Sequence, residues 1–278
     1  MSARTPPSLR NKTIAVIGLG QIGGSIVKCL SASRPTITLL AHDRDRRVAT
    51  RVSRHAEWVT DLLAVVDRSD VVILATPVPT IIALLKQVAA LRKPNDKKLL
   101  VLGTGTVKLA IHKEAARHRG QFTYIGLHPL AGVEGEGWDC ARDDLFVGKP
   151  MIVSPPSDSR LPLVRDLIRL LGAIPLPMEA RTHDRLVAEA IGLPHLLAFA
   201  AQGMSSDNPL TAGSWASLTR VAASNPEMVA GFLYTNAAEQ KRALARFERE
   251  LSKLKAALDD RSGRLLLKLI ADRQRTQG

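Results

Sequence analysis

The feature that most constrains this chain is a short apolar run followed at once by three spaced glycines. Residues 13–17 are apolar and rich in β-branched side chains, which predicts a buried strand. Gly18, Gly20 and Gly23 follow at G-x-G-x-x-G spacing, and a helical pattern then begins at Ile26. A strand, a glycine turn and a helix in this order form the context that a dinucleotide-binding fingerprint needs. Gly18 would make the tight turn, Gly20 would let a pyrophosphate approach the backbone, and Gly23 would let the helix pack on the strand.

An acid lies at the expected distance beyond these glycines. Residues 36–41 are predicted to form a second strand, and Asp43 follows it about 20 residues after Gly23, where the fingerprint places an acid that binds the ribose. Asp43 would accept both ribose hydroxyls and repel a 2′-phosphate, whereas Arg44 and Arg46 would attract one. NAD is therefore the expected cofactor, and NADP stays open. The predicted cofactor site comprises Gly18, Gly20, Gln21, Ile22, Gly23, Asp43, Arg44, Thr76 and Pro77.

Length and composition bound the class of protein. The 278 residues suggest one large or two ordinary domains, and contents of 45% hydrophobic and 4% aromatic residues predict an aliphatic core. Cys29 and Cys140 are isolated from each other, which argues for a reducing compartment and against structural zinc or a disulfide scaffold. We therefore expect no metal site.

No segment predicts export or membrane insertion. Residues 1–12 are polar and basic and contain no apolar signal region. The most apolar long stretch, residues 186–204, contains Glu189, Pro194, His195 and Gln202, which predicts a buried helix rather than a membrane span. We expect a cytoplasmic protein with no membrane partner.

The chain is strongly basic, with a formal net charge of +13. Such a surface attracts nucleic acid or small anions. The densest basic group lies on the helix predicted after the second strand and contains no aromatic residue, which favours a solvated helix face over a nucleic-acid site. This group consists of Arg44, Arg46, Arg47, Arg51 and Arg54.

The rest of the chain divides into an alternating part and a helical part. Five further strands are predicted at residues 71–75, 99–102, 122–126, 151–154 and 173–178, with helices between them. This alternation predicts an α/β fold with a Rossmann-type doubly wound sheet, with mixed strands late in the order. We expect a dinucleotide-binding domain at residues 1–178 and an all-helical substrate and dimerisation domain at residues 179–278. An apolar seam in the second domain is either core or a homodimer interface, and consists of Leu244, Phe247, Leu251, Leu254 and Leu258.

A histidine directly follows the fifth predicted strand. Residues at the carboxyl ends of parallel strands face the cofactor crevice. His128, in this position, could titrate near neutral pH and accept a proton as a hydride leaves. The residues alone are equally compatible with a general base and with a histidine that stabilises a turn.

Several further motifs occur in a fixed order along the chain. The most specific is His128-Pro-Leu-Ala-Gly132, followed by Glu134 and by Asp144-Leu-Phe146. The others are Thr106-Val107-Lys108, His183-Asp184-Arg185, Leu193-Pro194-His195, Thr219-Arg220-Val221, Asn225-Pro226-Glu227-Met228 and Asn236. Together with the fingerprint, this order resembles the prephenate/arogenate dehydrogenases of tyrosine biosynthesis over nearly the whole chain.

The resemblance implies an oxidative decarboxylation of a small anionic cyclohexadienyl substrate. Hydride would pass from ring C4 of prephenate or arogenate to NAD(P), giving 4-hydroxyphenylpyruvate or tyrosine. The resemblance also implies that His128 receives the hydroxyl proton and that Thr106 bridges cofactor, histidine and hydroxyl. Arg220 would hold a substrate carboxylate, His195 would line the pocket, and Glu134 would gate or polarise its entrance.

A structural alternative stays open for these residues. Thr106 could cap the next helix, and Arg220 could form a surface ion pair. His195 could be a buried, hydrogen-bonded helix histidine, and Glu134 a solvated loop acid. Residues 183–184, a histidine and an aspartate, are expected to be structural and to cap and anchor the first helix of the second domain.

The chain departs from the family pattern at three positions. It has Gly103 where aspartate is usual, Thr106 where serine is usual, and Gly192 where a histidine is common. Because these positions line the expected pocket, prephenate, arogenate and an amino-substituted prephenate analogue all stay open as substrates. Since the sequence ends at Gly278, we expect no appended mutase or regulatory domain.

Two other classes of protein stay open. A Rossmann dehydrogenase of the β-hydroxyacid type would place a catalytic lysine in the helical domain and would not need His128. A non-catalytic regulatory protein that senses dinucleotides or binds nucleic acid would not need His128, Thr106 and Arg220 together. The presence of all three residues favours the dehydrogenase.

Overall fold

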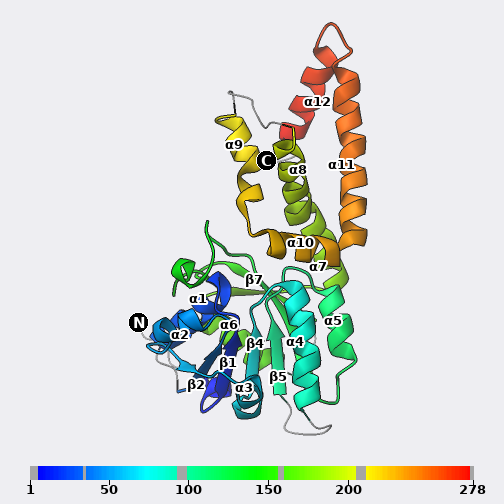
Figure 1. The fold of residues 1–278 in the computed structure, drawn as a ribbon. Helices are drawn as coiled ribbons and strands as arrows, with labels where there is room; N and C mark the ends of the chain where they lie inside the picture. Colours follow the sequence, from blue (N-terminus) through cyan, green and yellow to red (C-terminus); the bar gives the residue numbers. More distant parts are fainter. Residues whose placement is uncertain (1–5, 34–35, 93–98, 156–159, 205–210, 276–278) are drawn as a thin grey trace.

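The computed structural model describes residues 6–33, 36–92, 99–155, 160–204 and 211–275 (Figure 1). Its first part contains an eight-stranded sheet with the order β3-β2-β1-β4-β5-β6-β7-β8. Strands β1 to β6 run parallel, β7 is antiparallel to β6, and β8 is parallel to β7. The strands are β1 (Thr13–Ile17), β2 (Thr38–His42), β3 (Glu57–Trp58), β4 (Val71–Leu74), β5 (Leu99–Gly103), β6 (Phe122–Pro129), β7 (Pro150–Ser154) and β8 (Ile174–Pro177).

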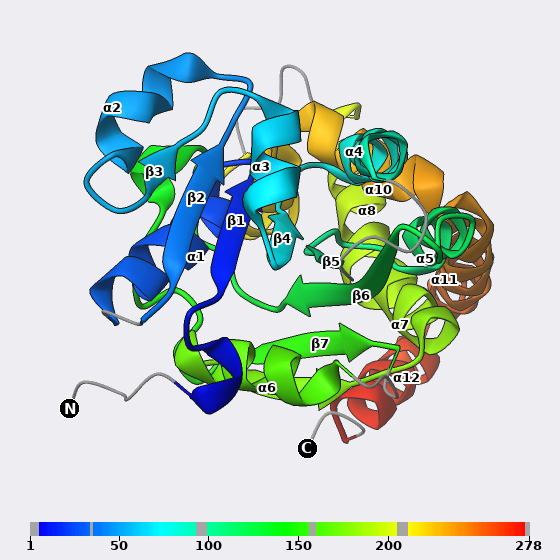
Figure 2. The same cartoon turned by 90° about the horizontal axis from the view of Figure 1, so that it is seen from below.

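Helices cover both faces of the sheet (Figure 2). On β1, Ile14 and Val16 face one hydrophobic cluster, whereas Ala15 and Ile17 face the other, as the two-residue period of a strand requires. The first cluster is covered by α1 (Gln21–Ala32) and α6 (Leu161–Leu170), and the second by α3 (Leu62–Arg68), α4 (Val78–Leu91) and α5 (Leu109–Ala116). Every residue of β4 is buried, as expected for a parallel strand covered on both sides.

The second part is helical and stands above the carboxyl edge of the sheet (Figure 1). Its elements are α7 (Ala180–Val187), the π-helix η4 (Ala188–Gly192), α8 (Leu193–Gln202), α9 (Ser214–Thr219), η5 (Arg220–Ala223), α10 (Pro226–Thr235), α11 (Ala237–Ala257) and α12 (Arg264–Arg275). It joins the sheet domain through α10, because Val229 and Phe232 belong to the second hydrophobic cluster. Helix α10 contacts α4 of the sheet domain at Gly231, where an added Cβ would lie 2.9 Å from Cδ of Pro79.

The predicted fold class, a doubly wound sheet followed by a helical region, is confirmed, including the mixed strands at the end of the order. The division at residue 178 stays a prediction; β8 ends at Pro177 and α7 begins at Ala180. Across the described ranges, no helix has the length and apolarity that a membrane span requires.

Two expectations about the first domain were wrong. The prediction had seven strands and missed β3, because its two residues are too few to show a period. The basic group after the second strand does not lie on one helix, since only a 3₁₀ turn, η2 (Arg46–Val48), and the single turn α2 (Ala49–Val52) form there. Arg44 precedes both elements and lies at the mouth of a cleft described below.

Two expectations about the second domain also need correction. Residues 186–204 do not form one buried helix: α7, η4 and α8 follow one another there, and Leu186 and Phe199 are 41% and 37% exposed. The alternative that the apolar seam is core of this chain holds at most in part, because Leu244, Phe247 and Leu254 are only half-buried, and Leu251 and Leu258 are 51% and 69% exposed. The apolar pattern therefore continues onto surfaces that a single chain leaves open to solvent.

Candidate active site

The glycine loop after β1 has the geometry that the fingerprint requires. Gly18 has a φ of +91°, and a Cβ there would lie 2.7 Å from the carbonyl oxygen of Ala75. A Cβ at Gly23 would lie 1.8 Å from the carbonyl oxygen of Gly18, so the helix packs directly on the turn. Nothing lies within 4 Å of a Cβ built on Gly20. The loop thus presents one open face at the N-terminus of α1, where free N–H groups and the helix dipole favour an anion.

A cleft of about 950 Å³ opens beside this loop. It lies at the point where the strand order reverses, with β2 and β4 on either side of β1. Of the predicted cofactor residues, Gly18, Gly20, Asp43, Arg44, Thr76 and Pro77 line it. Gln21, Ile22 and Gly23 form the first turn of α1 and are not among its lining residues.

Asp43 is held in place by the glycine loop. Its Oδ2 accepts a hydrogen bond from the backbone N–H of Leu19 at 2.6 Å, and its Oδ1 accepts one from Asp45 at 2.8 Å. A carboxylate oxygen can accept more than one hydrogen bond, so Asp43 keeps capacity for ribose hydroxyls. Two neighbouring arginines of the cleft are paired with acids: Arg47 with Asp45, and Arg51 with Asp139.

The cleft also contains a buried hydroxyl without a partner. Oγ1 of Thr76 is inaccessible to solvent and forms no hydrogen bond within the described residues. Burying a hydroxyl without a partner costs about 1–3 kcal/mol. Together with the open face at Gly20 and the carboxylate of Asp43, this hydroxyl suits a ligand that carries polar groups, and the residues present fit a dinucleotide.

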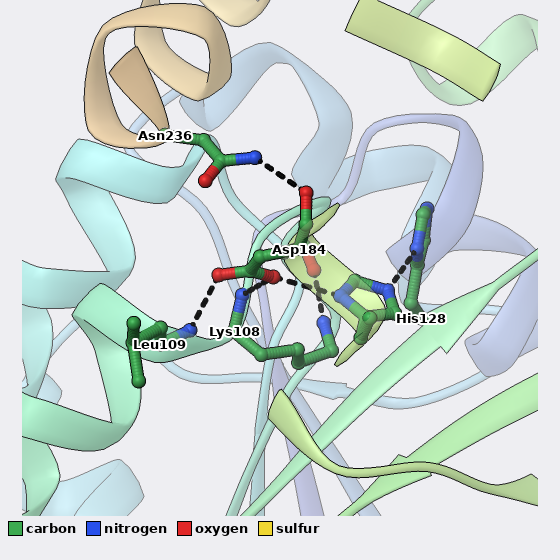
Figure 3. A network of polar contacts seen from close by, with 7 residues as sticks. Lys108, Leu109, His128, Asp184 and Asn236 are labelled. Atoms are coloured by element: carbon green, nitrogen blue, oxygen red, sulfur yellow. Dashed lines mark hydrogen bonds and ion pairs between the residues drawn. The ribbon is translucent and has the colours of Figure 1, made fainter. Parts of the chain in front are cut away.

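His128 lies at the carboxyl end of β6 and begins a chain of three buried polar side chains (Figure 3). Its Nδ1 lies 2.9 Å from Nε2 of His183, and Nδ1 of His183 lies 2.8 Å from Oδ1 of Asp184. The three side chains come from β6 and α7, and their residues are 8%, 2% and 3% exposed, respectively. We call them the histidine chain.

Asp184 also caps α5. Its Oδ1 accepts a hydrogen bond from the backbone N–H of Lys108 at 2.7 Å, and its Oδ2 accepts one from Leu109 at 2.8 Å. The side chain of Asn236 donates to the backbone carbonyl of Asp184 at 2.8 Å (Figure 3). The expectation that residues 183–184 cap the first helix of the second domain was therefore wrong, because they reach across to His128 and to α5.

Burial and nearby positive charge keep His128 neutral. Its pKa lies well below the ordinary value of 6.5, first because of burial and then because of Lys108 and His183. Burial also lowers the pKa of Lys108 to about 7, against the opposing effect of Asp184. The Lys108 ammonium donates to the carbonyl oxygen of Gly105. A neutral imidazole at the carboxyl edge of the sheet can accept a proton.

Thr106 lies between β5 and α5, on the same edge as His128. Gly103, the last residue of β5, pairs with Gly126 of β6, two residues before His128, so Thr106 follows the strand that neighbours β6. Thr106 does not cap α5, which begins at Leu109 and takes its cap from Asp184. The capping alternative for Thr106 was therefore wrong, and its half-buried hydroxyl remains at the edge of the sheet.

Arg220 of the helical part meets Glu134 of the loop that follows His128. Nη1 of Arg220 lies 3.6 Å from Oε1 of Glu134, and the two side chains are 62% and 82% exposed. A second contact joins the same segments, since Nδ2 of Asn225 donates to Glu136 at 2.9 Å. Arg220, predicted to hold a substrate carboxylate, and Glu134, predicted at the entrance, thus form a solvent-exposed ion pair, which is the structural alternative stated for Arg220.

His195 occupies a half-buried position in the first turn of α8. Its Nδ1 lies 2.8 Å from the carbonyl oxygen of Ile191, which must accept the ring proton, so Nε2 is left as an acceptor. Its ring meets that of Phe232 edge-on at 5.4 Å between centroids. The described contacts of His195 are to Ile191 and Phe232 and not to His128, so His195 is not part of the histidine chain.

Sequence reasoning missed the role of Lys108, His183 and Asp184, although it quoted all three as parts of motifs. It also could not explain the glycines that depart from the family pattern. A Cβ at Gly103 would lie 2.4 Å from the hydroxyl of Tyr124. A Cβ at Gly192 would lie 2.2 Å from both amide atoms of Gln240. Each glycine leaves room for a polar side chain of another element.

Comparison with known proteins gives a consistent result. The family model "Prephenate dehydrogenase, nucleotide-binding domain" matches residues 28–175, and "Prephenate dehydrogenase, dimerization domain" matches residues 179–272. A cyclohexadienyl dehydrogenase from Zymomonas mobilis is 30% identical over 282 residues, covering 96% of this chain and 95% of that protein. A prephenate dehydrogenase from Bacillus subtilis is 26% identical and covers 89% of this chain and 70% of its own length.

Solved structures agree with these matches. The crystal structure of prephenate dehydrogenase from A. aeolicus in complex with hydroxyphenyl propionate and NAD+ superimposes with a TM-score of 0.87 at 25% identity, covering 97% of this chain and 98% of that one. An arogenate dehydrogenase from Synechocystis shares the fold, with a TM-score of 0.77 at 23% identity and 95% and 98% coverage.

Proposed function

The chain belongs to the prephenate dehydrogenase family, and from that membership we propose a role for each residue of its site. It is an NAD(P)-dependent dehydrogenase that catalyses the oxidative decarboxylation of prephenate or arogenate. The single observation that supports the proposed chemistry is the neutral, buried His128 near the carboxyl end of β6, at the same edge of the sheet as the cleft that fits a dinucleotide.

His128 accepts a proton during hydride transfer. As hydride leaves ring C4, the hydroxyl proton on that carbon passes to Nε2 of His128 and a carbonyl group forms. The bond from ring C1 to its carboxylate then breaks, carbon dioxide leaves, and the electron pair makes the ring aromatic. The phenolate oxygen takes a proton to give the phenol. Bound in the cleft, the nicotinamide supplies the hydride acceptor.

Other residues bind and orient the reactants. Arg220 can hold a substrate carboxylate through two parallel hydrogen bonds. When the substrate enters, its carboxylate replaces Glu134 as the ion-pair partner of Arg220. Nε2 of His195 is an acceptor and faces a donor of the substrate from the helical part. The hydroxyl of Thr106 bridges the ring hydroxyl and His128 from the neighbouring strand end.

Asp43 favours NAD over NADP. Its carboxylate is fixed by Leu19 and Asp45 at the end of β2 and would repel a 2′-phosphate. Arg44 is exposed at the same cleft and is the residue that would attract one. NAD is therefore the preferred cofactor.

The active form is a homodimer through the helical part. Leu251 on α11, Leu258 directly after it, and Leu265, Leu267 and Ile270 on α12 are 45–69% exposed in the single chain, and the family model that covers them describes a dimerization domain. Leu258→Glu should shift the sedimentation coefficient from dimer to monomer. Leu63→Glu on α3 is the matched control, since Leu63 is also exposed, at 42%, and should leave the dimer intact. A wild-type monomer at micromolar concentration would refute the proposal.

One assay tests the proposed function. Purified protein is given prephenate, arogenate or an amino-substituted prephenate analogue, each with NAD or NADP, and formation of reduced nicotinamide and of carbon dioxide is followed. Equal amounts of both products with at least one of these substrates, and a higher kcat/KM with NAD, are expected. A preference for NADP would mean that Arg44 rather than Asp43 governs cofactor choice. Reduction of the dinucleotide only when a β-hydroxy acid is the substrate would support a Rossmann dehydrogenase of the β-hydroxyacid type.

A further inference from the structure

We propose that His183 and Asp184 are positioning residues that hold His128 with its Nε2 as the free proton acceptor and share the charge that His128 gains. The inference rests on the proposed function only for the reaction that His128 serves. The arrangement of the histidine chain stands on its own contacts.

The hydrogen bonds of the histidine chain fix the protons one after another. Asp184 accepts two backbone N–H groups, from Lys108 and Leu109, and an ionised carboxylate can only accept. Nδ1 of His183, 2.8 Å away, must therefore carry the proton between them. A neutral His183 then has a lone pair at Nε2, which requires a proton on Nδ1 of His128 at 2.9 Å. Nε2 of His128 is left as a lone pair.

The surroundings of His128 and His183 exclude the other tautomers of the two rings. His183 is 2% exposed, so water cannot replace either of its hydrogen bonds. Burial lowers the pKa of His183, which keeps its ring neutral and its Nε2 available as an acceptor. Asp184 is fixed by three further contacts, two at the start of α5 and one from Asn236 on its backbone carbonyl. The acceptor that orients His128 thus belongs to α7, in the helical part.

The same chain offsets the charge of the protonated state. When the substrate proton bonds to Nε2 of His128, the ring becomes an imidazolium whose Nδ1–H points at Nε2 of His183. That proton shifts toward His183, whose own Nδ1–H stays hydrogen bonded to the Asp184 carboxylate. One negative charge therefore faces the new positive charge through His183. The other titratable groups around this cluster are Lys108, whose positive charge opposes protonation of His128, the half-buried His112 and the buried Tyr124.

The tautomer of His128 can be read without any reaction. In ¹⁵N-histidine-labelled protein, the His128 resonances, assigned by their loss in His128→Asn, should show a protonated Nδ1 and a bare Nε2. His183→Phe keeps a ring of similar size but removes the acceptor, and should convert His128 largely to the Nε2–H form. His183→Gln offers an amide oxygen to Nδ1–H and should restore the wild-type pattern. Unchanged His128 resonances in His183→Phe would overturn the proposal.

Kinetics supply a second, separate readout. His183→Phe should lower kcat by at least about 100-fold, the range of a misplaced general base, with both KM values within about threefold of wild type. His183→Gln should recover at least about tenfold of that loss, which a purely structural role for the ring would not produce. His118→Phe is the matched control and should retain full activity, because His118 lies in the turn after α5 and pairs with Glu114, outside the histidine chain.

The outcomes separate the two hypotheses. If wild-type protein shows no dehydrogenase activity but the tautomer changes as described, the proposed function fails and the positioning role stands. If the tautomer changes while kcat stays within about threefold of wild type, less than a misplaced base would lose, then His183 does not position a catalytic base and the inference is wrong.

Discussion

At the scale of single residues, two glycines leave room for polar side chains of other elements. The hydroxyl of Tyr124 occupies the space beside Gly103, and the amide of Gln240 occupies the space beside Gly192. The Tyr124 hydroxyl and both the nitrogen and the oxygen of the Gln240 amide have no hydrogen-bond partner among the described residues. Each glycine is thus coupled to one neighbour, and a substitution at one member should depend on the other.

Gly103→Ala tests this coupling. The new Cβ would lie 2.4 Å from the Tyr124 hydroxyl, whose ring is part of the core and cannot move freely. Overpacking of this kind costs about 1–3 kcal/mol, so the free energy of unfolding should fall by that amount in urea titrations. Tyr124→Phe removes a buried hydroxyl without a partner and should leave stability unchanged or higher. In the double variant it should restore most of the loss; strictly additive effects would refute the coupling.

Arg220 provides a second prediction at this scale. Lysine keeps the charge but cannot form two parallel hydrogen bonds with a carboxylate. Arg220→Lys should therefore raise the KM for the cyclohexadienyl substrate at least about tenfold, equivalent to about 1.4 kcal/mol. The KM for the dinucleotide should barely change, because Arg220 lies on the helical part at η5. Equal weakening of both ligands would indicate a folding defect, and no weakening a surface arginine.

At the scale of elements, the site depends on the junction of α5, β6 and α7. Lys108, His128, His183 and Asp184 are buried there, and His112 is half-buried. The stem of Lys108 passes beneath β6 at Gly126, where a Cβ would lie 2.8 Å from its Cδ. This junction caps α5, joins the two parts of the chain and positions His128. The protonation of its side chains should therefore affect the free energy of unfolding.

Acid should destabilise this junction. Burial lowers the folded-state pKa of His112 to about 4, and it lowers the pKa values of His128 and His183 as well. The histidines of the unfolded chain bind protons at about pH 6.5, so below that pH the unfolded chain carries more protons than the folded chain. The contribution of His112 to stability should be complete above about pH 6.5 and be lost progressively as the pH falls from there to about 4.

Thermal unfolding monitored by circular dichroism checks this dependence. The melting temperature of wild type should decline between about pH 6.5 and 4, where the histidines of the unfolded chain become charged. His112→Phe removes one of the three groups and should flatten the curve, whereas His118→Phe, in the turn after the same helix, should not. A wild-type melting temperature constant across this range would contradict the assignment of neutral buried histidines.

At the scale of the whole molecule, local patterns predicted the architecture and left long-range contacts undetermined. The glycine spacing after residues 13–17 and the alternation of strands and helices were sufficient for the fold class, because each signal lies in residues that are close together in the sequence. The two-residue strand β3 has no period to detect. The cleft residues Asp43 and Thr76 were predictable because strand ends converge at one edge of a parallel sheet.

The histidine chain could not be predicted in the same way. His128 and His183 are 55 positions apart, and no spacing rule states which buried side chains will share a hydrogen bond. Motif resemblance placed both residues in the family pattern, but their mutual orientation follows from the packing of α7 over the sheet. Likewise, the apolar seam on α11 was visible in the sequence, whereas its exposure depends on the tertiary packing of α11.

The central claim is that His128 is the proton acceptor, and replacing it is the most direct test. His128→Asn keeps a hydrogen-bonding side chain of similar shape but cannot accept the substrate proton. General base catalysis contributes about 10²–10⁴-fold, so kcat should fall by that factor while KM for both ligands stays nearly constant. His118→Asn should behave as wild type. A kcat for His128→Asn within about threefold of wild type would be too small a loss for a general base and would contradict this account.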